Sequence, residues 1–211
     1  MRPGQNRIPR NRAPLKMDEK KIVKELKGLL SPARFKHSLR VREKALQLSN
    51  LHGINAKKAS VAGLLHDVAR YMDRAHLLAF ALKNNIKVDA VSRLEPKLLH
   101  APISAYIARK RFKIKDPAVL EAIRCHTLGK KNMSLLDKVI YIADHTEEGR
   151  THAGAKRSRE LAKKDLNKAV VEVSSSMINY LLKKGLPVHS RTYEVRNYYL
   201  LVNDKKKQRS N

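Results

Sequence analysis

The chain has 211 residues, a formal charge of +27 and a single cysteine. This length suits one domain with terminal extensions, and the lone Cys125 excludes a disulfide framework and fits a reducing compartment. No apolar run reaches the ~18 residues of a membrane span. The N-terminus lacks the apolar core of a signal peptide, so we expect a cytoplasmic protein with no membrane association.

The basic charge is compatible with weak nucleic-acid association, and equally with a solvated, lysine-rich surface. Aromatic residues make up only 5% of the chain and do not alternate with basic ones, which disfavours a dedicated single-strand binder. Residues 1–16 contain basic residues and prolines but no acidic residue, so we expect a disordered segment there. A second basic tail is expected over 204–211, which leaves one domain over 17–203.

Apolar residues recur with helical spacing over most of the chain, and no alternating strand pattern competes. Helix N-caps are expected at Ser31 and Asp116, each followed by proline, and a capping box at Ser134 and Asp137. The pattern therefore predicts an all-α, single-domain helical bundle. We expect helices over 17–30, 32–51, 56–70, 74–84, 102–112, 117–127, 135–147, 156–184 and 191–202.

The second predicted helix contains His37, one turn after its start. His37 shares a face with Val41 and Leu48, so its ring should point inward. A lone inward histidine is more often a hydrogen-bonded core residue than a metal ligand. The helix pattern alone leaves both roles open for His37.

The third predicted helix has one apolar face and a second face of small residues that ends in His66 and Asp67. Small residues indicate close packing against another element. Gly63 lies between His66 and Asp67 on the helical wheel, which predicts room for an ion or a phosphate there. Arg70, one turn further on, would meet an anion held by this pair. A His-Asp hydrogen bond in a packed interface is the alternative.

Three more polar residues lie at the ends of predicted helices. His100 directly precedes a helix start, where free N–H groups favour an anion, so it is expected to hold a second metal or a phosphate. His126, followed by Thr127, ends a later helix. Asp144 ends a helix that is apolar nearly all round, and a buried carboxylate needs a cation or several donors. A salt bridge to an arginine would also satisfy Asp144.

The candidate ligands are all imidazoles or carboxylates, and burying such groups costs several kcal/mol unless each finds a partner. A shared cation would partner them all, which indicates a metal-dependent phosphohydrolase. Mixed His and Asp ligands suit Fe, Mn, Zn, Co or Ni better than Ca. The candidate set is His37, His66, Asp67, His100, His126 and Asp144.

This set resembles that of the HD phosphohydrolase superfamily. The longer stretches over 64–70, 99–102, 122–127 and 133–144 resemble the YqeK family, and the resemblance covers roughly residues 18–203. Members of this family are all-helical and are known as symmetrical diadenosine tetraphosphate hydrolases that use iron. The resemblance therefore implies cleavage of a dinucleoside polyphosphate, with diadenosine tetraphosphate split into two ADP.

The resemblance also assigns roles to the metal-binding residues. One or two ions are implied, iron first, with Mn, Co, Ni or Zn as alternatives. His100 and His126 would complete a two-metal site or hold phosphate, and together with Asp67 they would serve catalysis. The core metal ligands would be His37, His66, Asp67 and Asp144.

Nucleotide contacts follow from the same resemblance. They are expected from Arg70, His100, His126, Thr127 and Arg150. Family members usually continue after the last aspartate with aromatic, aliphatic, Glu, Pro, any residue and Arg. Here Glu147 and Arg150 match this pattern, but the proline is absent and His145 replaces the aromatic residue. We therefore expect a differently shaped nucleotide-facing loop and leave the base preference open.

Two other classes of function stay open at this stage. One is an HD-fold protein that binds RNA or the ribosome through its basic surface. The other is a different HD enzyme, such as a nucleoside monophosphate phosphatase or a cyclic-nucleotide phosphodiesterase. The sequence leaves the oligomeric state open, with a homodimer among the options.

Overall fold

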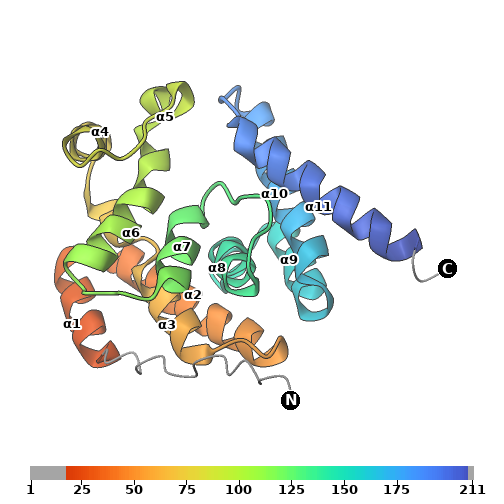
Figure 1. Ribbon diagram of the computed structural model, residues 1–211, viewed down its shortest axis with the longest axis horizontal. Coiled ribbons are helices and arrows are strands. Elements are labelled where there is room, and N and C mark those ends of the chain that lie inside the picture. Colours follow the sequence, from red (N-terminus) through yellow and green to blue (C-terminus); the bar gives the residue numbers. More distant parts are fainter. Residues whose placement is uncertain (1–17, 209–211) are drawn as a thin grey trace, which may run out of the picture.

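The computed structural model of the chain describes residues 18–208, leaving aside the side chains of 205–207, and contains no strand in that range. The all-α prediction is confirmed (Figure 1). The α-helices are α1 (Glu19–Leu29), α2 (Pro32–Leu51), α3 (Ala56–Leu65), α4 (Arg74–Lys83), α5 (Ala90–Leu94), α6 (His100–Lys110), α7 (Pro117–Cys125), α8 (Leu135–Thr146), α9 (Ala153–Lys164), α10 (Leu166–Lys183) and α11 (Ser190–Gln208). Two 3₁₀ helices are η1 (Val68–Tyr71) and η2 (Pro96–Leu99).

The helices form a bundle with α8 near its centre (Figure 1). Helix α8 packs against α2, α3 and α7 on one side and against α9 and α10 on the other. Helices α10 and α11 pack together at one edge, and α4 and α5 lie at the opposite upper edge. The side chains of α8 between Val139 and Ala143 are almost fully buried, as its all-round apolar sequence predicts.

The predicted helix N-caps are confirmed. Ser31 accepts a hydrogen bond from the backbone N–H of Arg34, and Asp116 accepts one from Ala118. Ser134 and Asp137 form a reciprocal capping box at the start of α8. These caps fix where α2, α7 and α8 begin, and thereby how far each helix reaches toward the centre of the bundle.

Two boundaries differ from the prediction at places that matter for the site. Helix α3 ends at Leu65 and not at residue 70, and a 3₁₀ turn begins at Val68. His66 and Asp67 therefore occupy the break between the two, and Asp67 has φ −109° and ψ 17°. Helix α6 begins at His100 itself, two residues before the expected start.

The helix predicted over 156–184 is two helices, and this prediction was wrong. The chain turns at Asp165, which leaves helical geometry and accepts hydrogen bonds from the N–H groups of Asn167 and Lys168. The break carries no glycine or proline, so an N-capping aspartate was its only signal. The prediction also missed α5 and η2, and α11 continues to Gln208, into the expected tail.

Gly63 serves helix packing and does not leave space for a ligand, which corrects the expectation from the helical wheel. A Cβ atom at Gly63 would lie 2.9 Å from Cα of Arg42 and 3.1 Å from its backbone nitrogen. The small face of α3 is therefore filled by the backbone of α2, as the prediction of close packing required. This contact brings His37 on α2 near the end of α3.

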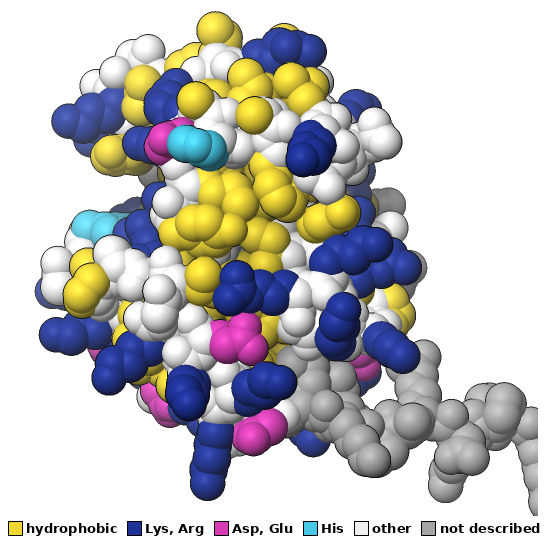
Figure 2. Space-filling view, turned by 90° about the vertical axis from the view of Figure 1, so that its left-hand side faces the viewer, with side chains coloured by type: hydrophobic (Ala, Val, Ile, Leu, Met, Phe, Trp, Pro, Cys, Tyr) yellow, Lys and Arg dark blue, Asp and Glu magenta, His cyan; other side chains and the backbone are white. Residues whose placement is uncertain are grey.

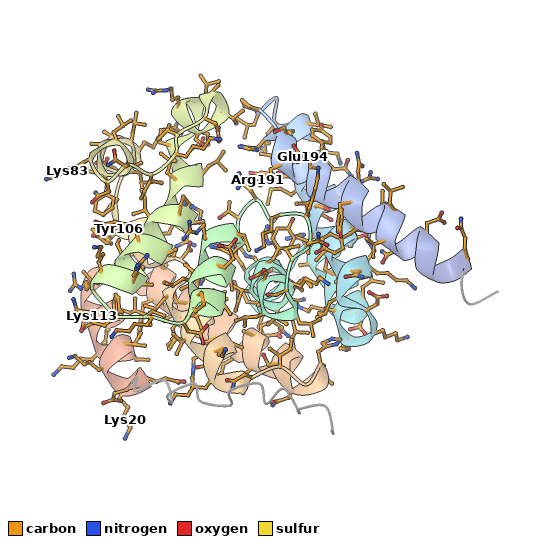
Figure 3. The ribbon with its side chains drawn as sticks, viewed as in Figure 1. Lys20, Lys83, Tyr106, Lys113, Arg191 and Glu194 are labelled. Carbon is orange, nitrogen blue, oxygen red and sulfur yellow. The ribbon has the colours of Figure 1, made fainter. Side chains whose placement is uncertain are left out.

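The outer surface carries both hydrophobic and basic side chains (Figure 2). Figure 2 shows a band of hydrophobic side chains across one face, with lysine and arginine side chains scattered around it. On the same side of the molecule, Tyr106 of α6 points toward α4, where its ring meets Phe80 edge-on at 5.6 Å (Figure 3). Among residues 18–208, no helix combines the length and the apolar character needed to cross a membrane.

Candidate metal centre

Six predicted ligands converge on one buried point between the central helices. They come from α2, from the breaks that follow α3 and α7, from the first turn of α6 and from the last turn of α8. Five of the six residues are at most 7% exposed, and the Asp144 side chain is 16% exposed. These residues are His37, His66, Asp67, His100, His126 and Asp144. The structure thus brings together side chains that lie more than a hundred residues apart in sequence.

The first group of ligand atoms surrounds the Nε2 atoms of His37 and His66, which lie 3.2 Å apart. Asp144 Oδ1 is 3.1 Å from Nε2 of His37 and 3.9 Å from that of His66. Asp67 Oδ2 is 3.6 Å and 3.5 Å from the same two nitrogens. Two imidazole nitrogens and two carboxylate oxygens therefore face one another in a single small space.

The second group surrounds the other oxygen of the same aspartate. Asp67 Oδ1 lies 3.2 Å from Nε2 of His100 and 3.7 Å from Nε2 of His126. Those two nitrogens are 3.0 Å apart, and Thr127 Oγ1 is within 3.2 Å of both. Asp67 consequently bridges two histidine pairs, one with each carboxylate oxygen.

The tautomers of the four histidines are fixed by acceptors that carry no hydrogen. His66 Nδ1 donates to the carbonyl of Gly63 and His126 Nδ1 to that of Ile123, both at 2.8 Å. His100 Nδ1 donates to the carbonyl of Lys97. His37 Nδ1 donates to the Glu147 carboxylate at 3.2 Å. All four Nε2 atoms are then left with lone pairs that point at one another.

This arrangement fits one or two divalent transition-metal ions. Facing lone pairs 3.0–3.2 Å apart repel each other unless a cation lies between them. Nitrogen and carboxylate donors, each held by a further hydrogen bond, are typical of such sites. One ion could be held by His37, His66, Asp67 and Asp144. A second could be held by Asp67, His100 and His126.

The charge states of His66, Asp67 and Asp144 favour metal binding. Burial lowers the pKa of His66 to about 3, so its ring stays neutral at pH 7. Burial opposes ionisation of Asp67, but the surrounding imidazoles of His66, His100 and His126 hold its pKa well below the usual range. Burial likewise opposes ionisation of Asp144, but His37, His145 and His66 together hold its pKa well below the usual range. Neutral imidazoles and ionised carboxylates are the forms that bind metal.

Glu147 supports the centre, and the sequence did not single it out as a site residue. It is 2% exposed, accepts from His37, and is held in turn by Arg40 and by the N–H of Gly149 at 2.6 Å. Burial opposes its charge, but the bond from Arg40 lowers its pKa. The sequence did carry a signal for Glu147, because a glutamate three residues after the last aspartate matches the pattern of the resembled family.

Arg34 of α2 contacts the centre, and Arg70 of η1 follows Asp67 in the chain. Arg34 Nη1 donates to Asp67 Oδ2 at 2.6 Å, and the Arg34 side chain is 29% exposed. The sequence analysis did not select Arg34, although it precedes His37 by three residues on one helix face. Arg70 follows Asp67 by three residues on η1, and burial, with a smaller contribution from the charge of Arg70, lowers the pKa of His100.

A cavity of about 820 Å³ opens from the other side of the centre. His100, Thr127 and Asp144 lie on its wall, together with Arg150, whose Nη2 is 3.3 Å from Asp144 Oδ1. His145 also lines the cavity, and it donates from Nδ1 to the Tyr141 carbonyl at 2.9 Å. The remainder of the wall comes mainly from η2 and from α9, α10 and the start of α11. Arg191 and Glu194 mark that start of α11 in Figure 3.

Comparison with known proteins places this geometry in a family. The family model of the HD domain matches residues 34–149, which include every ligand of the proposed centre. The chain is 36% identical over 185 residues to a protein of Halalkalibacterium halodurans named symmetrical bis(5'-nucleosyl)-tetraphosphatase. That match covers 88% of this chain and 98% of the relative.

Two further relatives agree with this placement. A protein of the same name from Bacillus subtilis is 31% identical, with 86% of this chain and 97% of the relative covered. A solved structure from Clostridium acetobutylicum is described as a predicted HD superfamily hydrolase involved in NAD metabolism. It is 36% identical and superimposes with a TM-score of 0.83 over 87% of this chain and 97% of that one.

Proposed function

This chain belongs to the HD domain family, and we propose that it is a metal-dependent hydrolase that splits diadenosine tetraphosphate symmetrically into two ADP. The observation that carries the proposal is the bridging Asp67, whose two oxygens face two pairs of histidine nitrogens beside a nucleotide-sized cavity. The names of relatives that match almost end to end support the substrate.

The proposed cofactor is iron, with Mn, Co, Ni or Zn as alternatives that the donor set also suits. Such ions, when bound, offset negative charge on phosphate oxygens and activate water near pH 7. The first ion would be held by His37, His66, Asp67 and Asp144. His100 and His126 would either hold a second ion with Asp67 or contact phosphate directly.

The reaction requires one bond to form and one to break. The oxygen of water forms a bond to one of the two inner phosphorus atoms, and the bond from that phosphorus to the central bridging oxygen breaks. The bridging oxygen leaves with the other ADP, and the protons of water pass to solvent. We expect Asp67 to orient the water, and Arg150, Arg70 and Thr127 to offset charge on the phosphates.

The cavity is proposed to receive one nucleoside. Its wall includes the apolar side chains Val173, Met177 and Leu181, while its inner end carries His100 and Arg150. An apolar wall with a few polar groups at one end is typical of nucleotide pockets. His145 lies where relatives of the resembled family carry an aromatic residue, so we expect it to affect the choice of base.

The decisive experiment is hydrolysis by the purified protein, with product analysis. Anaerobically purified protein is analysed for metals and then incubated with diadenosine tetraphosphate, nucleoside monophosphates and cyclic nucleotides. We expect bound iron and ADP as the sole nucleotide product of the tetraphosphate. Formation of ATP and AMP would contradict the symmetrical reaction, and activity only on the other substrates would indicate a different HD enzyme.

Three further expectations remain predictions. The protein is expected in the cytoplasm. Weak nucleic-acid association would show as binding with a steep dependence on salt. A homodimer would show as a doubled mass in solution.

A further inference from the structure

A symmetrical substrate has two identical nucleotide halves, and one large cavity formed by the described residues adjoins the centre. The cavity approaches the ligands from the side of His100, Thr127, Asp144 and Arg150. None of the residues of α2, α3 or η1 contributes to its wall. On the proposed function the cavity receives one half of the substrate, which leaves the side of α2 and η1 for the second half.

That side carries Arg34, whose guanidinium is mostly unused. A guanidinium has five N–H donors. Among the described residues, the side chain of Arg34 makes one hydrogen bond, from Nη1 to Asp67. Its exposure of 29% leaves the remaining donors open to an incoming ligand.

Other arginines near the centre are engaged in the fold. Arg40 holds Glu147 with Nε and Nη2. Arg159 donates to the backbone carbonyls of Thr146, Glu147 and Arg150 and so fixes the end of α8. Arg34 differs from both because it binds a predicted metal ligand by a single contact.

Arg70 lies on the same side. It is three residues after Asp67 on η1, and its charge acts on His100. Arg34 thus contacts the bridging carboxylate from outside the cavity, and Arg70 follows that carboxylate by three residues on η1. Phosphate oxygens are the substrate groups that best match such a pair of guanidinium groups.

We propose that Arg34, together with Arg70, binds the phosphates of the leaving half of the substrate, and that this half is recognised by its phosphates and not by its base. In the absence of substrate, Arg34 rests against Asp67 Oδ2. When the polyphosphate occupies the centre, the free donors of Arg34 bind its outgoing phosphates. This proposal rests on the proposed function and extends it.

The proposal predicts a second substrate. Adenosine 5'-tetraphosphate carries four phosphates but only one nucleoside. Its adenosine would occupy the cavity, water would attack the second phosphorus, and the bond to the next bridging oxygen would break. The products would be ADP and pyrophosphate, with the bridging oxygen leaving on pyrophosphate. We expect kcat/KM for this compound to be close to that for diadenosine tetraphosphate.

The test uses Arg34→Gln, with Arg111→Gln as a control of equal charge. Arg111 is exposed on the far end of α6, where it pairs with Glu25. We expect Arg34→Gln to lower kcat/KM on both tetraphosphates by roughly 10²-fold. Metal content should stay unchanged, because Arg34 is not a proposed metal ligand. Inhibition by the product ADP should also stay unchanged, because the proposal places ADP in the cavity. Arg34→Lys keeps the positive charge but loses the planar arrangement of five N–H donors, so it should recover part of the loss.

Three outcomes would overturn the proposal. The first is full activity of Arg34→Gln on both tetraphosphates. The second is loss of bound metal in that variant, which would make Arg34 a positioning residue for Asp67. The third is strong rejection of adenosine 5'-tetraphosphate by a wild-type protein that cleaves diadenosine tetraphosphate. If the wild-type protein cleaves neither compound, the proposed function itself fails.

Discussion

The metal centre and the cavity beside it are built in opposite ways. In the centre, each histidine is buried and its Nδ1 is tied to a backbone carbonyl or to Glu147. Along the cavity, Arg150 is 41% exposed, and His145 and Thr127 are only partly buried. The centre is thus rigid before any ligand arrives, whereas the cavity wall can adjust. This difference separates the chemistry of the site from its selectivity.

The largest effect is expected at the residue that joins the two histidine pairs. Asp67→Ala removes both bridging oxygens, so we expect loss of bound metal and a fall in hydrolysis of ~10³-fold or more. Elemental analysis and product formation measure the two effects, and circular dichroism checks that the helices persist. Unchanged metal content together with unchanged turnover would reject the metal centre.

A change on the cavity side should separate substrate binding from metal binding. Arg150→Gln removes a cation beside Asp144 but none of the proposed ligands. We expect kcat/KM on the tetraphosphate to fall by roughly 10²-fold while the metal is retained. Loss of metal in Arg150→Gln would show instead that this residue positions Asp144.

Support of the centre by Glu147 can be tested against its neighbour. Glu147→Gln weakens the acceptor that holds His37, and such changes typically cost 10–100-fold in metal affinity. Glu148→Gln makes the same chemical change at a carboxylate that is 66% exposed and pairs with Lys44. A chelator titration should therefore strip metal from the first variant at a lower chelator concentration, and leave the second equal to the wild type. Equal curves for all three proteins would contradict the role of Glu147.

The two regions also differ in how far the sequence predicts them. The ligands were identifiable because imidazoles and carboxylates in apolar helices require a partner, and His37, His66 and Asp144 have such surroundings. Glu147 and Arg34 were not selected, since their roles depend on contacts across 110 and 33 residues. The helix 156–184 was predicted as unbroken because propensity gives little warning of a turn capped by a single aspartate.

Gly63 shows the same limit and gives the smallest expected effect. A helical wheel places Gly63 between His66 and Asp67, but only the fold shows that the backbone of Arg42 fills the space beside it. Gly63→Ala places its Cβ against backbone that cannot rotate away, so we expect destabilisation of about 1–3 kcal/mol. Gly28→Ala, within α1, meets nothing within 4 Å and should stabilise by about 0.5–1 kcal/mol. Thermal or urea unfolding of the two variants measures the contrast. Equal stability of the variants would mean that α2 and α3 can separate at little cost, and that the rigidity of the centre comes from its hydrogen bonds alone.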